Sequence, residues 1–521
     1  MEQRFGFVLV LDQGVQLKQR AQLRALIAEI PGLLVTGGTT EVAGLACDSR
    51  RVVPGDLFFA LPGVKCDGWD YIAEALAAGA CALVLNRAPQ TEYGVPVVVA
   101  ENIRLAMAQI AQRFYADPSS DLLVIGVTGT NGKTTTSYLL ESILKAAGYR
   151  PAVFGTVDYR FGSEKIPASH TTPESIELLK LVAEFRGKGA NALILEVSSH
   201  ALEQHRVDGL KFNVAIFTNL TPEHLDFHGT MDAYFSSKAR LFDLVPAHSG
   251  VINLDDSYGV WLKDQHPDAL GFSRLLPTDI GLKQLSSDAN GQRGEMLIAG
   301  NAVALNSALV GDFNVSNILA AVAGAHCAGV TDEAIALGIA QAPQVPGRLE
   351  RVENRRGVLA LVDFAHTSDA LTQVLAALVG IPARRRITVV GCGGDRDPKK
   401  RPLMAAAAVR SSDLAVLTSD NPRTEDPLAI LEQMKLGAVE AGCELTFAEA
   451  VAGESGFVVI PDRRAALDFA ASLAAEGDLL LVAGKGHEDY QVLGTTKIHF
   501  DDREELTRAL NCATHTKGGH Q

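Results

Sequence analysis

A chain of 521 residues, 47% of them hydrophobic and 21% charged, is too long for one hydrophobic core, so we expect roughly three folded domains rather than a disordered chain. The formal net charge of −14 argues against general binding to nucleic acids or anionic membranes, and no apolar run approaches the roughly 18 residues of a membrane span. Seven cysteines without a C-x-x-C pair predict free thiols in a reducing compartment, and together with the lack of a signal-peptide pattern they predict a cytoplasmic protein.

Short strands and a helix in the first part of the chain predict a small N-terminal α/β domain over residues 1–118. Residues 47–50, Cys-Asp-Ser-Arg, form a polar turn, for which a purely structural loop is the simpler interpretation. Residues 117–120, Asp-Pro-Ser-Ser, predict a linker. Apolar runs predict strands at 57–60, 81–85 and 97–100, with a helix at 73–80.

A glycine-rich segment at 126–135, Gly-Val-Thr-Gly-Thr-Asn-Gly-Lys-Thr-Thr, lies between an apolar strand and a helical pattern. This is the context of a phosphate-binding loop, because glycines let backbone N–H groups surround phosphate oxygens at a helix N-terminus. Lys133 would neutralise nucleotide phosphates, and the Thr134 hydroxyl would ligate Mg²⁺. Five residues separate Gly126 from Gly132, whereas the common loop has four. The alternative is a turn that binds nothing, which leaves the Lys-Thr pair unexplained.

Strand and helix patterns alternate onward and predict a central parallel-sheet domain over residues 119–344. The apolar strand 192–195 ends at Glu196, whose carboxylate would suit Mg²⁺ in a sheet with a phosphate loop, or could simply face water. A second strand, 214–217, leads toward His224, although a histidine by itself is more often a core residue than a ligand. Two such strand ends predict one shared crevice.

Two helices in this region carry further candidates. The pattern at 231–245 predicts an amphipathic helix with Lys238, and a helical lysine is ordinarily solvated. Asn317 lies in an alanine-rich helix, where it could cap the helix or offer its amide to an adenine. Residues 343–346 predict a second linker.

The remaining chain predicts a C-terminal Rossmann-like α/β domain over residues 345–521. No G-x-G-x-x-G follows its first strand, which argues against a dinucleotide. Ligands of open α/β sheets bind beyond the carboxyl ends of the strands, so the polar clusters there should converge. The strands are predicted at 359–362, 387–390, 414–417, 457–460 and 479–482, and the clusters at 363–366, 391–401, 419–423 and 484–488.

Taken together, the motifs resemble the Mur ligase family, and in particular its members that add the third residue of the peptidoglycan precursor's peptide. The resemblance covers residues 41–505 and implies three domains: a uridine-binding domain, an ATPase-like domain and an amino-acid-binding domain. The motifs are GTNGKTT at 129–135, LEVSSHAL at 195–202, FTNL at 217–220, EHLDFH at 223–228, YFSSKARLF at 234–242, VPGR at 345–348, DFAHT at 363–367, GCGGDRD at 391–397, DNPR at 420–423 and GKGHE at 484–488.

The resemblance implies an ATP-dependent ligase acting on UDP-N-acetylmuramoyl-L-alanyl-D-glutamate through an acyl phosphate, with Mg²⁺ as cofactor and a monomeric chain. It implies catalytic roles for Lys133, Glu196, His224 and Lys238. The implied ATP contacts are Gly129, Thr130, Asn131, Gly132, Lys133, Thr134, Thr135, Asn317, Arg348 and Asp363. The implied UDP-muramoyl-dipeptide contacts are Cys47, Ser49, Val64, Lys65, Cys66, His170, Thr171, Thr172, Ser198, Gln204 and Arg206.

The resemblance changes the interpretation of Lys238. In the family the matching lysine is carbamylated, which makes it an anion that can ligate metal beside Thr134, Glu196 and His224. An unmodified ammonium, with a reference pKa of about 10.4, could not be a metal ligand.

The resemblance also implies diaminopimelate as the added amino acid. Arg423 offers a two-pronged donor to a carboxylate, and Arg396 offers another. Lysine lacks the second carboxylate and would leave an arginine unpaired, which costs about 1–3 kcal/mol. The implied diaminopimelate contacts are Arg396, Asp420, Asn421, Pro422, Arg423, Gly484 and Glu488.

Three positions depart from the family pattern, namely Phe364, Ser368 and Pro398, and none removes an assigned chemical group. The alternatives are a lysine-adding ligase, an enzyme similar to folylpolyglutamate synthetases, and a nucleotide-binding protein that does not ligate. Arg423 argues against each, because none of them needs a site for a second amino-acid carboxylate.

Overall fold

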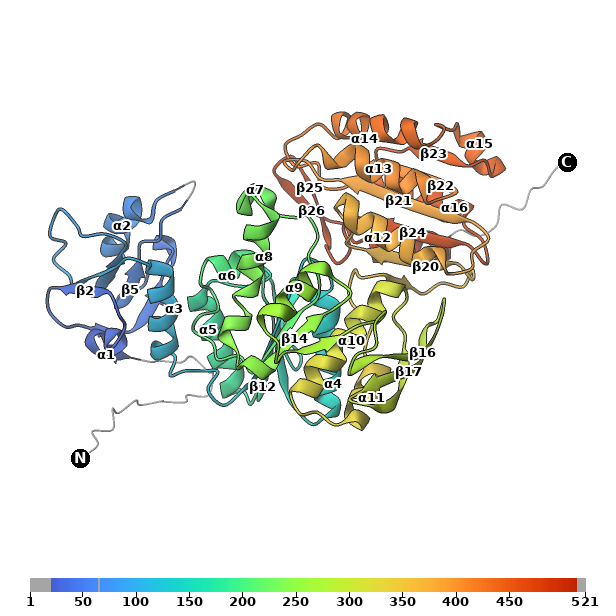
Figure 1. The fold of residues 1–521 in the computed structure, drawn as a ribbon. Coiled ribbons are helices and arrows are strands. Elements are labelled where there is room, and N and C mark those ends of the chain that lie inside the picture. Colours follow the sequence, from blue (N-terminus) through green and yellow to red (C-terminus); the bar gives the residue numbers. More distant parts are fainter. Residues whose placement is uncertain (1–19, 64–65, 513–521) are drawn as a thin grey trace. The chain divides into compact units, whose positions relative to one another are not determined.

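The computed structural model describes residues 20–63 and 66–512 (Figure 1). These described residues divide into two compact units: one holds those up to residue 272 together with 320–335, and the other holds 273–319 together with 336–512. Val64 and Lys65 lie outside the described residues. Within the described ranges, no helix combines the length and apolarity that crossing a membrane requires.

The first unit begins with a five-stranded sheet in which β2 runs antiparallel to β7 and the other neighbours are parallel. The three strands and the helix predicted for this region are confirmed to within a few residues. The spatial order is β2 (Leu33–Thr36), β7 (Val97–Ala100), β6 (Ala82–Leu85), β5 (Asp56–Phe59) and β4 (Gly44–Ala46), with the pair β1 (Ala21–Gln22) and β3 (Glu41–Val42) and helices α1 (Leu23–Ile27), α2 (Ile72–Ala77) and α3 (Ile103–Phe114).

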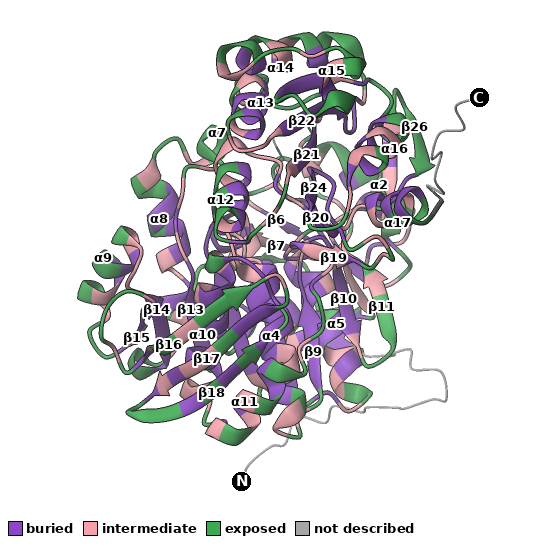
Figure 2. Ribbon diagram, turned by 90° about the vertical axis from the view of Figure 1, so that its right-hand side faces the viewer, coloured by how far each residue is buried: buried purple, intermediate pink, exposed green. Residues whose placement is uncertain are grey.

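The second sheet of this unit carries the phosphate loop. Strand β8 (Leu123–Thr128) lies between β12 (Ala192–Glu196) and β13 (Val214–Phe217), all parallel, so three carboxyl ends meet at one edge. The residues of these strands are largely buried, and Figure 2 shows buried residues throughout the region around them. A strand that is covered on both faces of its sheet has an unbroken apolar sequence, as these strands do. The flanking strands are β11 (Glu164–Pro167), β10 (Asp158–Phe161) and β9 (Pro151–Phe154) beyond β12, and β14 (Gly250–Asn253) and β15 (Leu270–Phe272) beyond β13.

The helices of this part begin with α4 (Lys133–Ala146), directly after the phosphate loop. The predicted helix at 231–245 is too long: α8 ends at Ala239, and a 3₁₀ turn at Phe242–Leu244 follows. Leu241 and Phe242 turn into the core, and Pro246 disfavours helical backbone at residue 245. The other helices are α5 (Ser175–Gly187), α6 (Ser199–Glu203), α7 (Leu225–His228), α8 (Met231–Ala239) and α9 (Ser257–Gln265).

An antiparallel ladder opens the second unit, where continued strand–helix alternation was the expectation. Its strands are β16 (Ile280–Asp288), β17 (Gly291–Ile298) and β18 (Asn301–Ser307). The turn between β17 and β18 has positive φ at Ala299 (47°) and Gly300 (87°), the backbone of a two-residue hairpin. Helices α10 (Asp312–Cys327) and α11 (Asp332–Ala340) then follow and lead toward residue 345.

The second unit also contains a six-stranded sheet, parallel except for β19, with helices that bury both of its faces. The five predicted strands are confirmed, as is the α/β fold class. The sheet order is β19 (Glu350–Val352), β20 (Leu359–Asp363), β24 (Leu479–Ala483), β21 (Arg386–Cys392), β22 (Leu414–Ser419) and β23 (Gly456–Val459). The helices are α12 (Ser368–Val379), α13 (Lys400–Arg410), α14 (Pro427–Ala441), α15 (Phe447–Ala452), α16 (Arg463–Leu473) and α17 (Asp502–Cys512), and a hairpin joins β25 (Tyr490–Leu493) to β26 (Thr496–His499).

Candidate active site

The phosphate loop requires glycine where the sequence places it. Gly129 has φ 144°, and a Cβ there would lie 1.9 Å from Thr218 Oγ1. Gly132 has φ 88° and precedes the first residue of α4, Lys133. The backbone therefore turns sharply from β8 into the helix and presents N–H groups at the helix N-terminus, where anions are favoured.

The end of β13 holds this loop in place. Thr130 N donates to Asn219 O (2.9 Å), Asn131 N donates to Asn219 Oδ1 (2.9 Å), and Thr218 Oγ1 donates to Asn131 O (2.6 Å). Tyr234 adds a contact of 3.2 Å between its hydroxyl and Thr130 Oγ1. The loop is thus fixed before any ligand binds, which lowers the entropy cost of binding.

Two lysine side chains meet at one carbonyl of the loop. Lys133 Nζ donates to Gly129 O and Thr130 O, both at 2.8 Å, and Lys238 Nζ donates to Gly129 O at 2.9 Å. Lys238 is only 2% exposed, and its burial, followed by the nearby charge of Lys133, holds the pKa of its amine well below the usual value. Lys133, at the rim of the loop, supplies a positive charge that suits a polyanion.

Glu196 lies beside the loop, at the end of β12, and is 1% exposed. Its carboxylate accepts hydrogen bonds from Thr134 Oγ1 (3.0 Å), Thr156 Oγ1 (2.9 Å) and Thr156 N (3.1 Å). Thr135, next along α4, is also buried. A carboxylate and a hydroxyl oxygen are ligands that Mg²⁺ accepts together with substrate phosphates, so these residues fit the predicted ion.

His224 lies in a cluster of rings rather than in a preformed metal cage. Its ring centroid is 4.8 Å from that of His200 and 6.2 Å from that of Tyr234, and burial lowers its pKa. His228 stacks near Tyr234 at 5.0 Å and contacts Ser199 Oγ at 2.9 Å. Throughout the described part of the chain, no three or more His, Cys, Asp or Glu side chains gather as a metal site.

The predicted dipeptide contacts gather next to Glu196. Thr172 Oγ1 donates to Glu196 O (2.8 Å), and Ser198 N donates to Thr172 Oγ1 (3.1 Å). Arg206 donates to Thr172 O (2.8 Å) and Gln204 Oε1 (2.7 Å) and pairs with Glu174 (3.0 Å). Thr171 Oγ1 lies 3.2 Å from Thr156 Oγ1, and His170 is exposed, with its carbonyl bound to the Tyr159 hydroxyl.

The predicted uridine contacts lie in the five-stranded sheet's loops. Ser49 Oγ donates to Glu74 Oε2 at 3.0 Å, so its position is fixed. Burial raises the pKa of the Cys47 thiol to about 11, so the thiol stays protonated at neutral pH. Cys66 is exposed, and its two preceding residues are outside the described ranges.

The second unit holds the remaining predicted nucleotide contacts. Asp363 is buried and accepts from Leu349 N (2.7 Å) and Ala365 N (2.8 Å), and burial raises the pKa of its carboxyl although Arg348 opposes the rise. The Arg348 guanidinium lies 5.0 Å from the centroid of the Phe364 ring. Asn317 Nδ2 donates to Asn314 Oδ1 at 2.9 Å, which leaves its amide oriented by the helix itself.

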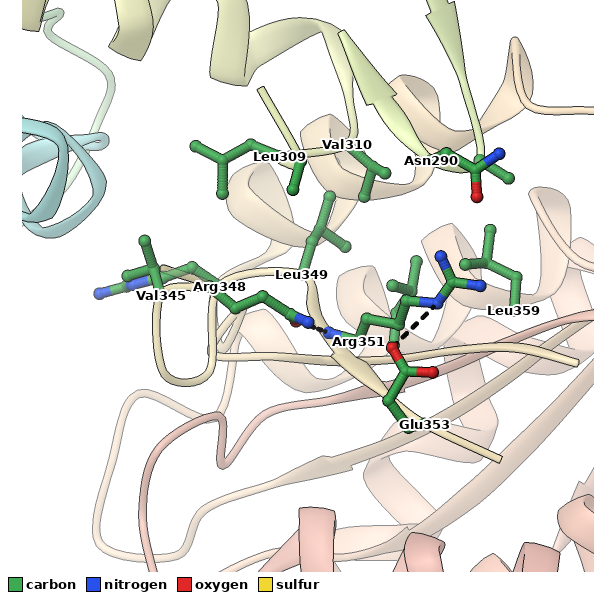
Figure 3. Close-up of a pocket in the computed structure, with 13 residues that line it drawn as sticks. Asn290, Leu309, Val310, Val345, Arg348, Leu349, Arg351, Glu353 and Leu359 are labelled. Atoms are coloured by element: carbon green, nitrogen blue, oxygen red, sulfur yellow. Dashed lines mark hydrogen bonds and ion pairs between the residues drawn. The ribbon is translucent and has the colours of Figure 1, made fainter. Parts of the chain in front are cut away.

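A cavity of about 150 Å³ adjoins Arg348 (Figure 3). Leu309, Val310, Leu349 and Leu359 give it an apolar wall, and the Arg351 guanidinium lies 3.7 Å from the Glu353 carboxylate at its edge. Of the predicted site residues that the structure describes, Arg348 is the one that lines this cavity. The polar clusters of the C-terminal strands therefore converge elsewhere.

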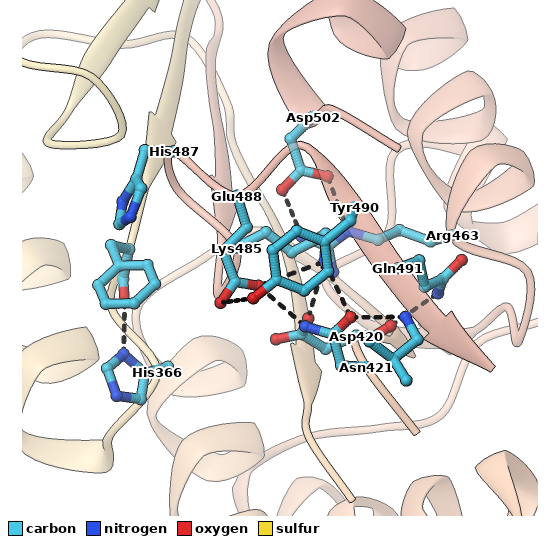
Figure 4. A network of polar contacts seen from close by, with 12 residues as sticks. His366, Asp420, Asn421, Arg463, Lys485, His487, Glu488, Tyr490, Gln491 and Asp502 are labelled. Atoms are coloured by element: carbon cyan, nitrogen blue, oxygen red, sulfur yellow. Dashed lines mark hydrogen bonds and ion pairs between the residues drawn. The ribbon is translucent and has the colours of Figure 1, made fainter. Parts of the chain in front are cut away.

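They converge around Lys485, which is fully buried (Figure 4). Its Nζ lies 3.4 Å from Asp420 Oδ1, 3.3 Å from Asn421 Oδ1 and 3.5 Å from Glu488 Oε2. Asn421 Nδ2 donates to Glu488 Oε2 at 2.9 Å. Burial and then Asp420 raise the pKa of Glu488. Two carboxylates beside one lysine leave a net negative polar cluster that suits an ammonium group.

The two predicted arginines lie in adjacent loops at the same sheet edge. Arg423 Nη1 donates to Gly394 O at 2.7 Å, and Arg396, which is exposed, donates to Asp395 O at 3.1 Å. Pro422 is buried between Asn421 and Arg423. Gly484 has φ 117°, and a Cβ there would lie 3.0 Å from Asp420 Oδ2, so a side chain at this position would crowd that carboxylate.

Several contacting residues were not predicted. Thr156 and Asn219 follow strands and are polar, which was a usable signal, but their partners are distant in sequence. Lys485 lies in the GKGHE motif and was not among the predicted contacts. Two groups of predicted residues come together, one in each unit: the phosphate loop with its neighbours, and the polar cluster around Lys485.

Three family models match the chain in order: the catalytic domain of the Mur ligase family over residues 41–115, the Mur ligase middle domain over 127–325, and the Mur ligase glutamate ligase domain over 347–486. A curated protein of Geobacter sulfurreducens, named UDP-N-acetylmuramoyl-L-alanyl-D-glutamate–2,6-diaminopimelate ligase, is 46% identical over 501 residues, covering 94% of this chain and 98% of that protein. One of the same name from Geobacter metallireducens is 46% identical over 485 residues, covering 90% and 94%. The solved structure of a ligase with that name matches with a TM-score of 0.66 and 35% identity, covering 91% of this chain and 96% of that one.

Proposed function

The chain belongs to the Mur ligase family, and from that membership we propose that it joins 2,6-diaminopimelate to UDP-N-acetylmuramoyl-L-alanyl-D-glutamate with conversion of ATP to ADP and phosphate. The product would be a peptidoglycan precursor. We propose further that the enzyme works in the cytoplasm as a monomer. Its three domains would be residues 1–118 for the uridine, 119–344 for ATP and 345–521 for the amino acid.

Two displacements make up the reaction. A free carboxylate is a poor electrophile, so an oxygen of the D-glutamate carboxylate first attacks the γ-phosphorus of ATP, and the bond to the β–γ bridging oxygen breaks as ADP leaves. The diaminopimelate amine then attacks the acyl carbon of the acyl phosphate and loses a proton as inorganic phosphate leaves. Positioning and charge stabilisation at the transferred phosphoryl group are the main tasks of the protein.

The residues around the phosphate loop suit these tasks. Lys133 would exchange the Gly129 and Thr130 carbonyls for phosphate oxygens, and the N–H groups of the loop would surround them. Thr134, Glu196 and His224 would hold Mg²⁺, which when bound neutralises charge on the phosphoryl group. Asn317, Arg348 and Asp363 would contribute to holding the nucleotide.

We propose that Lys238 acts as a carbamate. Its buried amine has a strongly lowered pKa and is therefore available in the neutral form, which is the form that adds to CO₂. The nitrogen forms a bond to the carbon of CO₂ and releases one proton, which leaves a carboxylate-like anion. That anion could ligate metal, whereas an ammonium in the same place would repel it.

The polar cluster around Lys485, with the two arginines near it, supports diaminopimelate over lysine. Both amino acids have a distal ammonium group, which Glu488 and Asp420 would accept. Diaminopimelate has a second carboxylate as well, and Arg423 and Arg396 offer guanidinium groups in the loops at the same sheet edge. A lysine side chain would leave an arginine without its partner, a discrimination of about 1–3 kcal/mol.

The observation that carries the ligase proposal is the contact of Thr134 with Glu196 beside two lysines that share the Gly129 carbonyl. The test is phosphate release from ATP with the UDP-muramoyl-dipeptide, measured with diaminopimelate, with lysine and with neither. We expect release only with an amino acid, and a kcat/KM for diaminopimelate that exceeds that for lysine by about tenfold or more. Equal rates for both amino acids would refute the specificity, and release without any amino acid would refute ligation.

A further inference from the structure

An ion pair between a buried arginine and a partly exposed glutamate joins the two loops that carry Arg396 and Arg423. Arg401, the second residue of α13, is 1% exposed. Its Nη1 and Nη2 donate to the two carboxylate oxygens of Glu425, both at 2.8 Å. This two-pronged geometry is the strongest form of an arginine–carboxylate contact and fixes orientation as well as distance. The pair connects the start of α13 to the segment just before α14.

Each partner also reaches the loop that carries Arg396. Arg401 Nη1 donates to Gln433 Oε1 (2.8 Å), and Arg401 Nη2 donates to Gly393 O (3.3 Å). Glu425 accepts from the backbone N–H of Asp395, the residue before Arg396. Asp395 in turn accepts from Thr424 Oγ1 at 2.7 Å, the residue after Arg423. Arg401 and Glu425 therefore hold the residues adjacent to both arginines.

The backbone of the two loops that carry Arg396 and Arg423 is in a conformation that these residues do not favour by themselves. Arg423 has φ 52° and Asp395 has φ 53°, a left-handed backbone that side chains other than glycine rarely adopt. Gly394 N donates to Asn421 O at 2.9 Å, and a Cβ on Gly394 would lie 1.9 Å from Pro422 O. Such strained, closely packed backbone persists only where surrounding contacts enforce it.

We propose that Arg401 and Glu425 are positioning residues for amino-acid selection: their ion pair sets the separation of Arg396 and Arg423, and that separation favours an amino acid with a second carboxylate over lysine. Neither residue touches the substrate in this assignment. The assignment rests on the proposed function, because it presupposes that the two arginines receive diaminopimelate. Replacing Arg401 by lysine would keep the positive charge and lose the two-pronged hydrogen bonding to the Glu425 carboxylate.

The experiment compares wild type with R401M, R401K and E425Q in steady-state kinetics with diaminopimelate, lysine and ATP as varied substrates. We expect R401M to raise KM for diaminopimelate about tenfold or more and to reduce the diaminopimelate-over-lysine ratio of kcat/KM by a similar factor, with KM for ATP within about twofold of wild type. R401K and E425Q should fall between wild type and R401M. K435M is the matched control: Lys435 lies on α14, two residues after Gln433, and forms a partly exposed ion pair with Glu444, which follows that helix, so K435M should leave all these constants unchanged.

The outcomes separate this assignment from the proposed function. A wild-type enzyme that ignores diaminopimelate would overturn both. If wild type responds to diaminopimelate while R401M, or E425Q where R401M does not fold, has a lower melting temperature and an unchanged selectivity ratio, the ion pair only stabilises the domain and this assignment is wrong. Equal increases in the KM values for ATP and diaminopimelate would also overturn it.

Discussion

The carbonyl oxygen of Gly129 accepts hydrogen bonds from two lysines, and this shared acceptor constrains their protonation. Lys133 lies at the rim of the loop, whereas Lys238 is buried and its pKa is lowered first by burial and then by Lys133. Two ammonium groups at one carbonyl repel each other. Of the two lysines, Lys238 is the one whose pKa is strongly lowered, so we expect an apolar side chain at this buried position to be more stable than the amine.

Replacing Lys238 by methionine should therefore stabilise the unliganded protein in bicarbonate-free buffer. The folded protein binds fewer protons at Lys238 than the unfolded chain does, so the stability cost grows as pH falls from 10.5 toward the folded pKa. We expect K238M to melt at a higher temperature than wild type, by a margin that widens as pH is lowered through that window. Thermal unfolding at several pH values measures it, and a margin that shrinks toward low pH would contradict the expectation.

The same position should be indispensable for activity. If Lys238 acts as a carbamate, K238A should lower phosphate release by about 100-fold or more, because a group that stabilises the transferred phosphoryl charge is lost. Added acetate should restore part of the rate by supplying a carboxylate. K211A is the control, since Lys211 is an exposed residue paired with Asp117. A carbamate carbon signal from labelled bicarbonate in wild type, absent in K238A, would support the role independently, and full activity of K238A would exclude it.

At the scale of elements, the turn between β8 and α4 tolerates no side chain at Gly129. A Cβ there would lie 1.9 Å from Thr218 Oγ1, whereas a Cβ at Gly148, just after α4, meets nothing within 4 Å. Both glycines have positive φ, 144° and 85°. G129A should abolish ATP binding, and G148A should cost only about 1 kcal/mol of stability and keep it. Calorimetric titration with ATP tests this, and measurable ATP binding by G129A would show that the loop can open.

An ion-pair network joins α4 to β10 and should make stability depend on pH. Arg160 pairs with Glu141 (2.5 Å) and Asp158 (2.7 Å) and lies 3.9 Å from the centroid of the Tyr138 ring. Burial by itself raises the pKa of Glu141, but Arg160 and Lys145 outweigh burial and lower the pKa below 4.5. Its contribution is complete above that value and is lost as pH falls through the folded pKa.

E141Q should therefore lower the free energy of unfolding by roughly 1.5–3 kcal/mol at neutral pH, and this difference should vanish in acid. Urea unfolding of both proteins at neutral pH and near pH 3 measures the difference. E164Q is a control, because Glu164 pairs with Lys188 at the surface and such a pair contributes about 0–1 kcal/mol. A difference that persists unchanged in acid would assign it to packing rather than charge.

The elements that the sequence predicted correctly were those with a local signal. Glu196 ends an unbroken apolar run, and the glycines of the phosphate loop stand next to a lysine and two threonines. Thr156 and Asn219 lie 40 and 88 residues from the partners they contact, so their roles emerge only after β9, β12, β8 and β13 align. The antiparallel ladder β16 to β18 did have a local signal, the glycines at 291 and 300 near its turns. Such turn glycines indicate hairpins more strongly than the alternation of strands and helices elsewhere indicates a helix here.

At the scale of the whole molecule, the domain boundary predicted between residues 344 and 345 differs from the boundaries of the two compact units. The second unit includes residues 273–319, before that boundary. Val310 belongs to the same apolar core as Leu349, Leu359 and Leu361, with Phe313 packed against it. A C-terminal domain cut at 345 would therefore expose apolar surface that residues before the boundary cover.

The fragment 345–521 should consequently be less stable than the same residues within the full chain, and V310A in the full chain should reproduce part of that loss. Burying a valine side chain contributes about 1.5–3 kcal/mol, which sets the scale for Val310, 6% exposed. V379A is the matched control, because Val379 is 63% exposed and should change stability by about 0.5 kcal/mol at most. Hydrogen exchange of β20, β21 and β24 measures the stability of this sheet in each protein. Equal protection in the fragment, V310A and wild type would mean that the preceding segment does not stabilise the sheet. Reduced protection in the fragment and in V310A, with V379A unchanged, would mean that the residues which stabilise this unit begin before residue 310.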